Sequence, residues 1–239
     1  MSSAGNDGDS SEARVRSPIR LVVVEDEPLY RDLLCAWLER AGFVVVGVFA
    51  DPVSALRVTP ALSPDVALLD IELGSSVSGV EIGIGLRRSM PELGIVLLSN
   101  HARPQLLAAL PADVAAGWSY LSKRTVSDGD ALSRAITGAA EGLVVFDAAL
   151  TAASVIRAGS PIARLSPRQR QIVALIAQGY SNKAIGEELV LTEKSVENHI
   201  TRIYQMVGID AHDPVNHQRV RMAVLYMTCT TDAPRYSRA

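Results

Sequence analysis

Between residues 18 and 142, short apolar runs alternate with segments of helical periodicity. The strand-like runs are Ile19–Val24, Phe43–Phe49, Val66–Leu69, Ile95–Leu98 and Trp118–Leu121. The helical segments that follow them, in the same order, span Leu29 to Leu38, Pro52 to Val58, Val80 to Arg88, Pro104 to Leu110 and Gly129 to Glu141. The runs are apolar throughout, as strands covered on both faces of a parallel sheet must be. The pattern predicts a doubly wound α/β domain with a five-stranded parallel sheet and a site at the carboxyl ends of its strands.

The first helical segment has the period of an amphipathic helix. One predicted apolar face carries Leu29, Leu33 and Trp37, with Leu34 and Leu38 beside it.

From Arg164 onward the pattern is purely helical, and four helices are predicted. The first begins with a serine cap, a proline at the first helical position and a glutamine placed to complete a capping box, at Ser166, Pro167 and Gln169. The other boundaries are Gly179 after the first helix, caps at Ser181 and Thr192, Gly208 after the third helix, and a fourth helix from near Asp213 to about Met227. A short helix, a tight turn and a longer helix with a polar outer face describe a helix-turn-helix.

These patterns divide the chain into five segments. They are a disordered tail (1–17), the α/β domain (18–142), a linker (143–163), a small all-α domain of four helices (164–229) and a second tail (230–239).

Composition narrows the class of protein. The chain has 239 residues, of which 48% are hydrophobic, so it can bury a sizeable core and is not disordered throughout. The two cysteines, Cys35 and Cys229, lie far apart in apolar surroundings, which excludes a disulfide scaffold and a cysteine zinc site and suits a reducing cytosol. No apolar run approaches the roughly 20 residues of a membrane span. We therefore expect a cytoplasmic protein without membrane contact.

The net charge of −3 is unevenly distributed. Residues 1–163 carry 13 basic and 19 acidic side chains, whereas residues 164–239 carry 10 basic and 7 acidic ones. The basic segment is where nucleic acid is expected to bind. Lysine is rare, and the three lysines are Lys123, Lys183 and Lys194.

Carboxylates follow two predicted strands that are neighbours in a doubly wound sheet. Glu25 and Asp26 follow the first strand and Asp70 follows the third, so the three carboxylates are expected to converge on one crevice. A few oxygen ligands with room for a phosphoryl group favour Mg²⁺. Ser99 ends the fourth strand and Lys123 the fifth, and a lysine opposite carboxylates can pair with an aspartate at rest and with a phosphoryl oxygen afterwards. Any one of these residues could be a solvated turn residue, but the whole set is hard to explain in that way.

At these positions the sequence resembles the receiver domain of two-component response regulators, over about residues 18–142. The matching segments are Val22–Glu27, Ala67–Asp70, Val96–Ser99 and Tyr120–Lys123. The resemblance implies a flavodoxin-like fold in which a histidine kinase phosphorylates Asp70. It also implies that Mg²⁺ is held by Glu25, Asp26, Asp70 and the backbone carbonyl of Glu72, that Ser99 and Lys123 bind phosphoryl oxygens, and that Tyr120 swings inward on activation.

The segment departs from the receiver pattern in three places. The loop of residues 71–79 is longer than usual and lacks its customary proline, Asn100 replaces a smaller residue, and Ser119 replaces a frequent glycine. None of these changes removes a required group, so we expect a competent site with altered kinetics. Tyr120 has an alternative interpretation as the ordinary packing of a half-buried residue on a short edge strand.

The helical segment resembles the LuxR-type DNA-binding domain, almost continuously from residue 164 to residue 209. The matching segments are Leu165–Ile172, Gly179–Gly186 and Thr192–Ile200. The third predicted helix buries Val196, Ile200, Ile203 and Val207 and turns its polar residues outward. The expected DNA contacts are Ser181, Lys183, Lys194, Glu197, Asn198, Thr201 and Arg202.

Glu197 is the ambiguous member of this set, because its carboxylate could accept from a cytosine amine or simply repel phosphate. The fourth helix carries an amphipathic stripe of Val220, Ala223, Val224 and Met227. The resemblance implies that this helix dimerises, and the alternative is that the stripe covers its own domain.

Together, the two resemblances indicate a response regulator of the NarL/FixJ class, which is not an enzyme. The leading hypothesis is a transcription regulator that is phosphorylated on Asp70 by a sensor histidine kinase and binds double-stranded operator DNA as a homodimer. One alternative is a regulator controlled by a protein or small ligand without phosphorylation. Another is a Mg²⁺-dependent aspartyl phosphotransferase or phosphatase, which the sequence disfavours because it has no insertion large enough for a cap domain.

Overall fold

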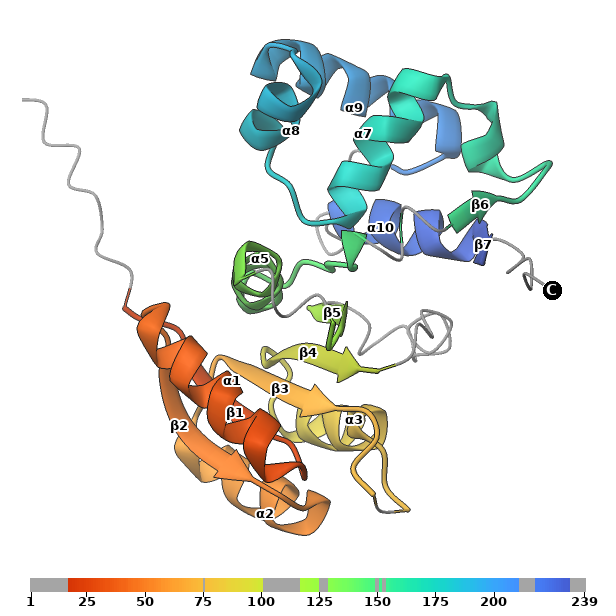
Figure 1. Ribbon diagram of the computed structural model, residues 1–239. Coiled ribbons are helices and arrows are strands. Elements are labelled where there is room, and N and C mark those ends of the chain that lie inside the picture. Colours follow the sequence, from red (N-terminus) through yellow and green to blue (C-terminus); the bar gives the residue numbers. More distant parts are fainter. Residues whose placement is uncertain are drawn as a thin grey trace, which may run out of the picture.

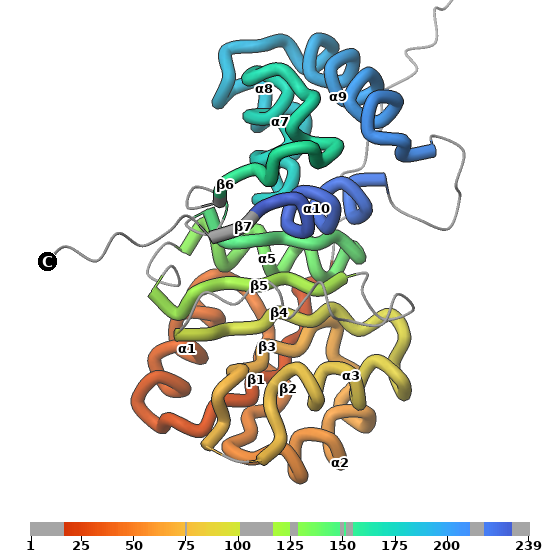
Figure 2. Tube along the Cα trace, turned by 90° about the vertical axis from the view of Figure 1, so that its right-hand side faces the viewer, coloured from red at the N-terminus to blue at the C-terminus, as the bar shows by residue number. Residues whose placement is uncertain are grey.

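The computed structural model describes residues 17–74, 76–100, 117–124, 129–148, 151, 154–210 and 218–232. The expected tail up to residue 16, the expected helix at 104–110 and the start of the last helix near Asp213 lie outside these residues. Figure 1 and Figure 2 show a sheet flanked by helices in the N-terminal part of the chain and a group of helices in the C-terminal part.

The sheet is parallel and has the strand order β2-β1-β3-β4-β5. Its strands are β1 (Arg20–Val24), β2 (Val44–Phe49), β3 (Val66–Asp70), β4 (Gly94–Ser99) and β5 (Trp118–Ser122). Successive residues of each strand face opposite sides of the sheet and pack into two separate hydrophobic clusters. One cluster includes α1 (Pro28–Arg40) and α5 (Gly129–Ala140), and the other includes α2 (Pro52–Leu62) and α3 (Gly79–Ser89). Burial on both faces explains the continuous apolar strands, and the predicted doubly wound sheet is confirmed.

The prediction of which residues form the buried face of α1 is wrong in part. Leu34 and Leu38 are the buried residues of this helix, whereas Leu29 and Leu33 are 69% and 62% exposed. Leu34 and Leu38 follow Tyr30 at intervals of four residues, so these three side chains form the stripe that faces the sheet. Leu29 and Leu33 each precede a member of that stripe by one residue, which turns them by about 100° around the helix axis.

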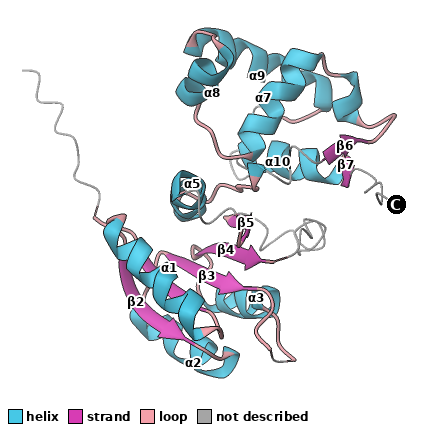
Figure 3. Ribbon diagram, in the orientation of Figure 1, coloured by secondary structure: helices cyan, strands magenta, loops and turns pink. Residues whose placement is uncertain are grey.

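The C-terminal part is helical, as predicted. It contains the short helix η2 (Pro161–Arg164) and the helices α7 (Pro167–Ala177), α8 (Asn182–Leu189), α9 (Glu193–Val207) and α10 (Gln218–Thr228). The predicted caps are confirmed at Ser166, which forms a capping box with Gln169, and at Ser181 and Thr192. Outside the helices, β6 (Ser154–Ile156) and β7 (Thr230–Asp232) form a small antiparallel ribbon that brings part of the expected linker and tail together (Figure 3).

Residues 144–147, which belong to the expected linker, line the outer edge of β5. The Tyr120 N–H donates to the Val145 carbonyl at 2.8 Å, and the Asp147 N–H donates to the Tyr120 carbonyl at 3.0 Å. On the other side, the Phe146 N–H donates to the carbonyl of Ala177 at the end of α7, also at 2.8 Å. This short extended segment therefore connects the sheet directly to the helical part.

Two side-chain contacts support the same junction. Gly179, after α7, lies so close to Val145 that a Cβ built on it would stand 2.7 Å from a Val145 methyl carbon. The Arg134 guanidinium on α5 lies 4.7 Å from the centre of the Tyr180 ring, within the range of a cation–π contact.

Candidate functional site

Three carboxylates meet at the carboxyl end of the sheet, as the sequence predicts. Glu25 and Asp26 follow β1, and Asp70 is the last residue of β3, which pairs with β1. One oxygen from each lies within 4.8 Å of the others. Glu25 and Asp70 are 1% and 2% exposed, so these are not solvated turn residues.

Lys123 brings the positive charge to this cluster. Its Nζ lies 2.7 Å from Glu25 Oε2 and 3.0 Å from Asp70 Oδ2, and its side chain is 7% exposed. The Lys123 N–H donates to the Ser99 carbonyl at 2.8 Å, so the backbone that carries the lysine is fixed to the end of β4. The predicted pairing of Lys123 with Asp70 is therefore observed.

Burial sets the electrostatics of the cluster. It raises the pKa of Glu25 and the pKa of Asp70 above their ordinary values, although hydrogen bonds, including those from Lys123, counteract it. Burial alone would lower the pKa of Lys123, but its bonds to Glu25 and Asp70 outweigh that effect and raise it. The site thus holds three acids against one ammonium group and favours a further cation.

The donor set fits a hard divalent cation such as Mg²⁺. Carboxylate oxygens from Glu25, Asp26 and Asp70 converge on one point, and a small number of oxygen ligands is what Mg²⁺ takes when it keeps several waters. Gly74, which has a φ of +56°, lies over Asp26, and a Cβ built on it would stand 2.9 Å from Asp26 Oδ2. A residue larger than glycine at position 74 would therefore fill the space beside the Asp26 carboxylate.

The remaining predicted residues of this site occupy neighbouring positions. Ser99 is 1% exposed at the end of β4, where it pairs with Ser122. Glu72 is exposed, and its N–H donates to Asp70 Oδ1 at 3.2 Å, whereas a role for its carbonyl as a ligand stays a prediction.

Tyr120 is not the half-buried edge residue that the sequence suggests. It is fully buried, and its strand is not an open edge, because the backbone of residues 144–147 lines the outer side of β5. The aromatic ring is thus already inside the fold, and its role as a switch stays a prediction.

Two residues of α1 belong to the site and were missed from the sequence. Arg31 Nη1 donates to the carbonyl of Glu25 at 2.9 Å and to that of Asp26 at 3.4 Å, which fixes the loop that carries both acids. The Tyr30 ring lies 4.6 Å from Lys123 Nζ. The only signal in the sequence was their position one turn after the acidic residues.

The candidate DNA-binding surface is the outer face of α9 together with the start of α8. Val196, Ile200 and Ile203 are buried as predicted, whereas Val207 is only partly buried. Glu197 is partly exposed, and the other expected contacts are exposed, namely Ser181, Lys183, Lys194, Asn198, Thr201 and Arg202. Their contact with DNA stays a prediction, and the helix faces solvent as such a contact requires.

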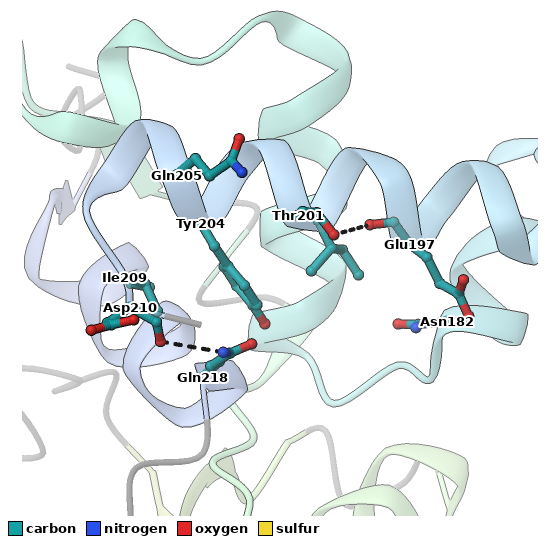
Figure 4. Close-up of a pocket in the computed structure, with 9 residues that line it drawn as sticks. Asn182, Glu197, Thr201, Tyr204, Gln205, Ile209, Asp210 and Gln218 are labelled. Carbon is teal, nitrogen blue, oxygen red and sulfur yellow. Dashed lines mark hydrogen bonds between the residues drawn. The ribbon is translucent and has the colours of Figure 1, made fainter. Parts of the chain in front are cut away.

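Four of these side chains already have partners within the protein. The Ser181 hydroxyl caps α8 by accepting from the Ala184 N–H at 3.2 Å. The Thr201 hydroxyl donates to the Glu197 carbonyl one turn earlier at 3.0 Å, beside a cavity of about 470 Å³ bordered by α8, α9 and α10 (Figure 4). Lys194 Nζ lies 2.9 Å from Glu197 Oε2, so the ambiguous glutamate neutralises the lysine one turn before it.

Replacing Glu197 with glutamine is expected to strengthen non-specific DNA binding several-fold, because it removes a repulsive charge and releases Lys194 for a phosphate. The plot of log affinity against log salt should steepen by about 0.9, the value of one additional phosphate contact. Fluorescence anisotropy of a labelled DNA duplex at several salt concentrations measures both effects.

The matched control for this change is Glu39→Gln on α1. It alters the net charge equally, at an exposed position in the other part of the chain. An equal gain in both variants would mean that only the net charge matters.

The stripe on α10 mainly serves its own domain. Ala223 and Met227 are 1% and 8% exposed and pack in the core with α7, whereas Val220 and Val224 are partly buried. A role in dimerisation stays a prediction, and the partly exposed pair is the part of the stripe that a partner could reach.

Comparison with known proteins agrees with the two-part organisation. Residues 21–137 match the family model of the response regulator receiver domain, and residues 163–211 match that of the bacterial regulatory proteins of the luxR family. None of the helices among the described residues is long and apolar enough to cross a membrane.

The relatives span almost the whole chain. Transcriptional regulatory protein MctR of Rhizobium johnstonii is 32% identical over 81% of this chain and 89% of its own length. A probable transcriptional regulatory protein NarL of Mycobacterium tuberculosis is 29% identical over 87% of this chain and 96% of its own. A solved structure of RcsB from Salmonella typhimurium covers 89% of this chain and 98% of its own, with 20% identity and a TM-score of 0.46.

The family consists of transcription regulators rather than enzymes, which removes the phosphotransferase alternative. A receiver fold with its acidic cluster and a LuxR-type helix-turn-helix lie in one chain. The chain belongs to the NarL/FixJ family of two-component response regulators.

Proposed function

We propose that this response regulator is switched by phosphorylation of Asp70 by a sensor histidine kinase. The observation that carries the proposal is the buried Asp70 carboxylate, which lies beside Glu25, Asp26 and the Lys123 ammonium group. A purely structural aspartate would not be buried beside two further acids with one lysine to balance them.

The chemistry follows from this arrangement. An oxygen of Asp70 attacks the phosphorus, a P–O bond forms, and the bond from phosphorus to the kinase imidazole nitrogen breaks, leaving its electron pair on the nitrogen. Lys123, already at hydrogen-bond distance from Asp70, stays protonated and neutralises a phosphoryl oxygen. Glu25, Asp26 and Asp70 would hold Mg²⁺, which supplies charge neutralisation and in-line positioning when bound. The Ser99 hydroxyl is the proposed donor to another phosphoryl oxygen.

The structure contains a continuous route from this site to the helical domain. Lys123 follows β5, and the backbone of Tyr120 in that strand is hydrogen-bonded to residues 145 and 147. Phe146, which lies between these two residues, is hydrogen-bonded through its N–H to the end of α7. A change at Ser99 or Lys123 therefore acts on a strand that is joined to the DNA-binding domain through residues 145–147. We propose that phosphorylation shifts this junction and favours a homodimer on operator DNA in the cytoplasm, with Val220 and Val224 of α10 at the dimer interface.

The proposal is tested by incubating the full chain with Mg²⁺ and acetyl phosphate, with Asp70→Asn as the control. We expect the intact mass to increase by one phosphoryl group in the wild type alone, together with a change from monomer to dimer in light scattering. If the wild type gains no phosphoryl group, the regulator answers instead to a protein or small ligand, the alternative that the sequence left open.

A further inference from the structure

Tyr30 extends the phosphoryl site on the side of Lys123. It lies in the first turn of α1, which begins at Pro28, and long side chains at such positions point back toward the start of their helix. The centre of its ring is 4.6 Å from Lys123 Nζ, well within the distance of about 6 Å at which a ring attracts a cation. The ammonium group thus has two carboxylates and one aromatic ring around it.

The contribution of Tyr30 comes from its ring rather than from its hydroxyl. The hydroxyl oxygen is buried and has no hydrogen-bond partner among the described residues. Burial and the nearby carboxylates of Glu25, Asp70 and Glu27 raise the pKa of Tyr30 far above its ordinary value, so it remains neutral. Among the described residues, the contact between the ring and Lys123 is the polar interaction that this side chain makes.

The ring differs from the other two partners of Lys123 in one respect. Glu25 and Asp70 are also two of the three carboxylates that would hold a divalent cation, so a cation competes with the lysine for their oxygens. An aromatic face does not bind such a cation in place of carboxylates. The ring is therefore the contact that Lys123 keeps while its carboxylate partners are shared with metal and phosphoryl group.

We propose that Tyr30 is a positioning residue for phosphoryl transfer, because its ring holds the Lys123 ammonium group beside Asp70. This inference builds on the proposed function of Asp70. It predicts that removing the ring impairs transfer and that removing the hydroxyl alone does not.

The test compares Tyr30→Phe with Tyr30→Met and Tyr30→Leu, which fill the space without a ring. Phosphoryl gain from acetyl phosphate is followed by intact mass, and ¹⁵N-lysine NMR reports on the ammonium group itself. The chain has three lysines, and Lys183 and Lys194 are exposed, so they serve as internal references for fast proton exchange. Leu33→Ala, on the exposed side of the same helix, controls for changes in helix stability.

We expect Tyr30→Phe to stay within twofold of the wild-type phosphorylation rate and to keep a slowly exchanging Lys123 signal. The two variants without a ring should react about tenfold more slowly and lose that signal, with little change in melting temperature. Wild-type behaviour of both ringless variants, or loss of function in Tyr30→Phe, would overturn the role of the ring while leaving the role of Asp70 intact. If the wild type itself gains no phosphoryl group, the proposed function fails and this inference fails with it.

Discussion

Replacing Lys123 with methionine should slow phosphorylation of Asp70 by about 100-fold or more, the usual cost of removing one preorganised donor from a site where negative charge develops. The same change should tighten Mg²⁺ binding about tenfold, because the ammonium group lies 2.7 Å and 3.0 Å from two of the carboxylates that a cation would use. Intact mass after reaction with acetyl phosphate measures the first effect, and the rise in melting temperature on addition of Mg²⁺ measures the second.

The opposite directions of these two effects separate them from misfolding, which would weaken both. Lys183→Met is the matched control, since this lysine is exposed at the start of α8 and far from the acidic cluster in sequence. If Lys123→Met bound Mg²⁺ more weakly than the wild type, the competition between lysine and cation for the same oxygens would be refuted.

Replacing Gly79 with alanine should destabilise the receiver by about 3 kcal/mol, toward the upper end of the range for overpacking. Gly79 is the first residue of α3, and a Cβ built on it would stand 2.2 Å from the carbonyl oxygen of Asp70 and 2.9 Å from its carbonyl carbon. These are backbone atoms of Asp70, the proposed phosphoacceptor, and cannot rotate away, so the strand end that carries Asp70 must move. Urea denaturation gives the loss of stability, and acetyl phosphate gives the accompanying loss of reactivity.

Gly85→Ala, in the same helix, is the control for this prediction. A Cβ there would stand 2.9 Å from the end of the Leu56 side chain, which can move, and alanine gains about 1 kcal/mol of helix propensity over glycine. The free energy of unfolding should therefore change by no more than about 1 kcal/mol. Equal losses in both variants would show that close approach to Asp70 is not the reason for a glycine at residue 79.

The sequence predicted the acidic site well because its residues stand at strand ends. An apolar run that stops at Asp70, Ser99 or Lys123 defines both the strand and the residue at its carboxyl end. A parallel sheet then brings those ends together whatever the details of packing. The caps at Ser166 and Thr192 were equally predictable, because a cap is a local hydrogen bond between residues three positions apart.

The residues of α1 were harder to predict, because their roles depend on how the helix is turned. Leucines at 29, 33, 34 and 38 allow two overlapping stripes, and local periodicity does not decide between them. Packing on the sheet selects the stripe that contains Tyr30 and Leu34, and only then does Tyr30 face Lys123. Contacts of this kind join residues that are far apart in sequence, and periodicity within one helix carries no information about them.

The pairing of the segment after α5 is hard to predict for a related reason. Leu143 to Phe146 is a short apolar run of strand type, but it follows the fifth repeat of strand and helix, at which the sheet of a doubly wound domain can already be complete. Its partner, the edge of β5, is identified only by the three-dimensional fold.

Residues 143–147 also determine where the receiver can be cut from the rest of the chain. A chain ended at residue 142 would lose the partners of the Tyr120 peptide group and would present an open strand edge, the kind of surface through which proteins aggregate. A chain ended at residue 148 would keep these partners, although Phe146 would no longer have Ala177 as its partner. A receiver that is to be fused to the output domain of another response regulator should therefore include residues 143–147, although they resemble a linker. The fusion point belongs after Asp147.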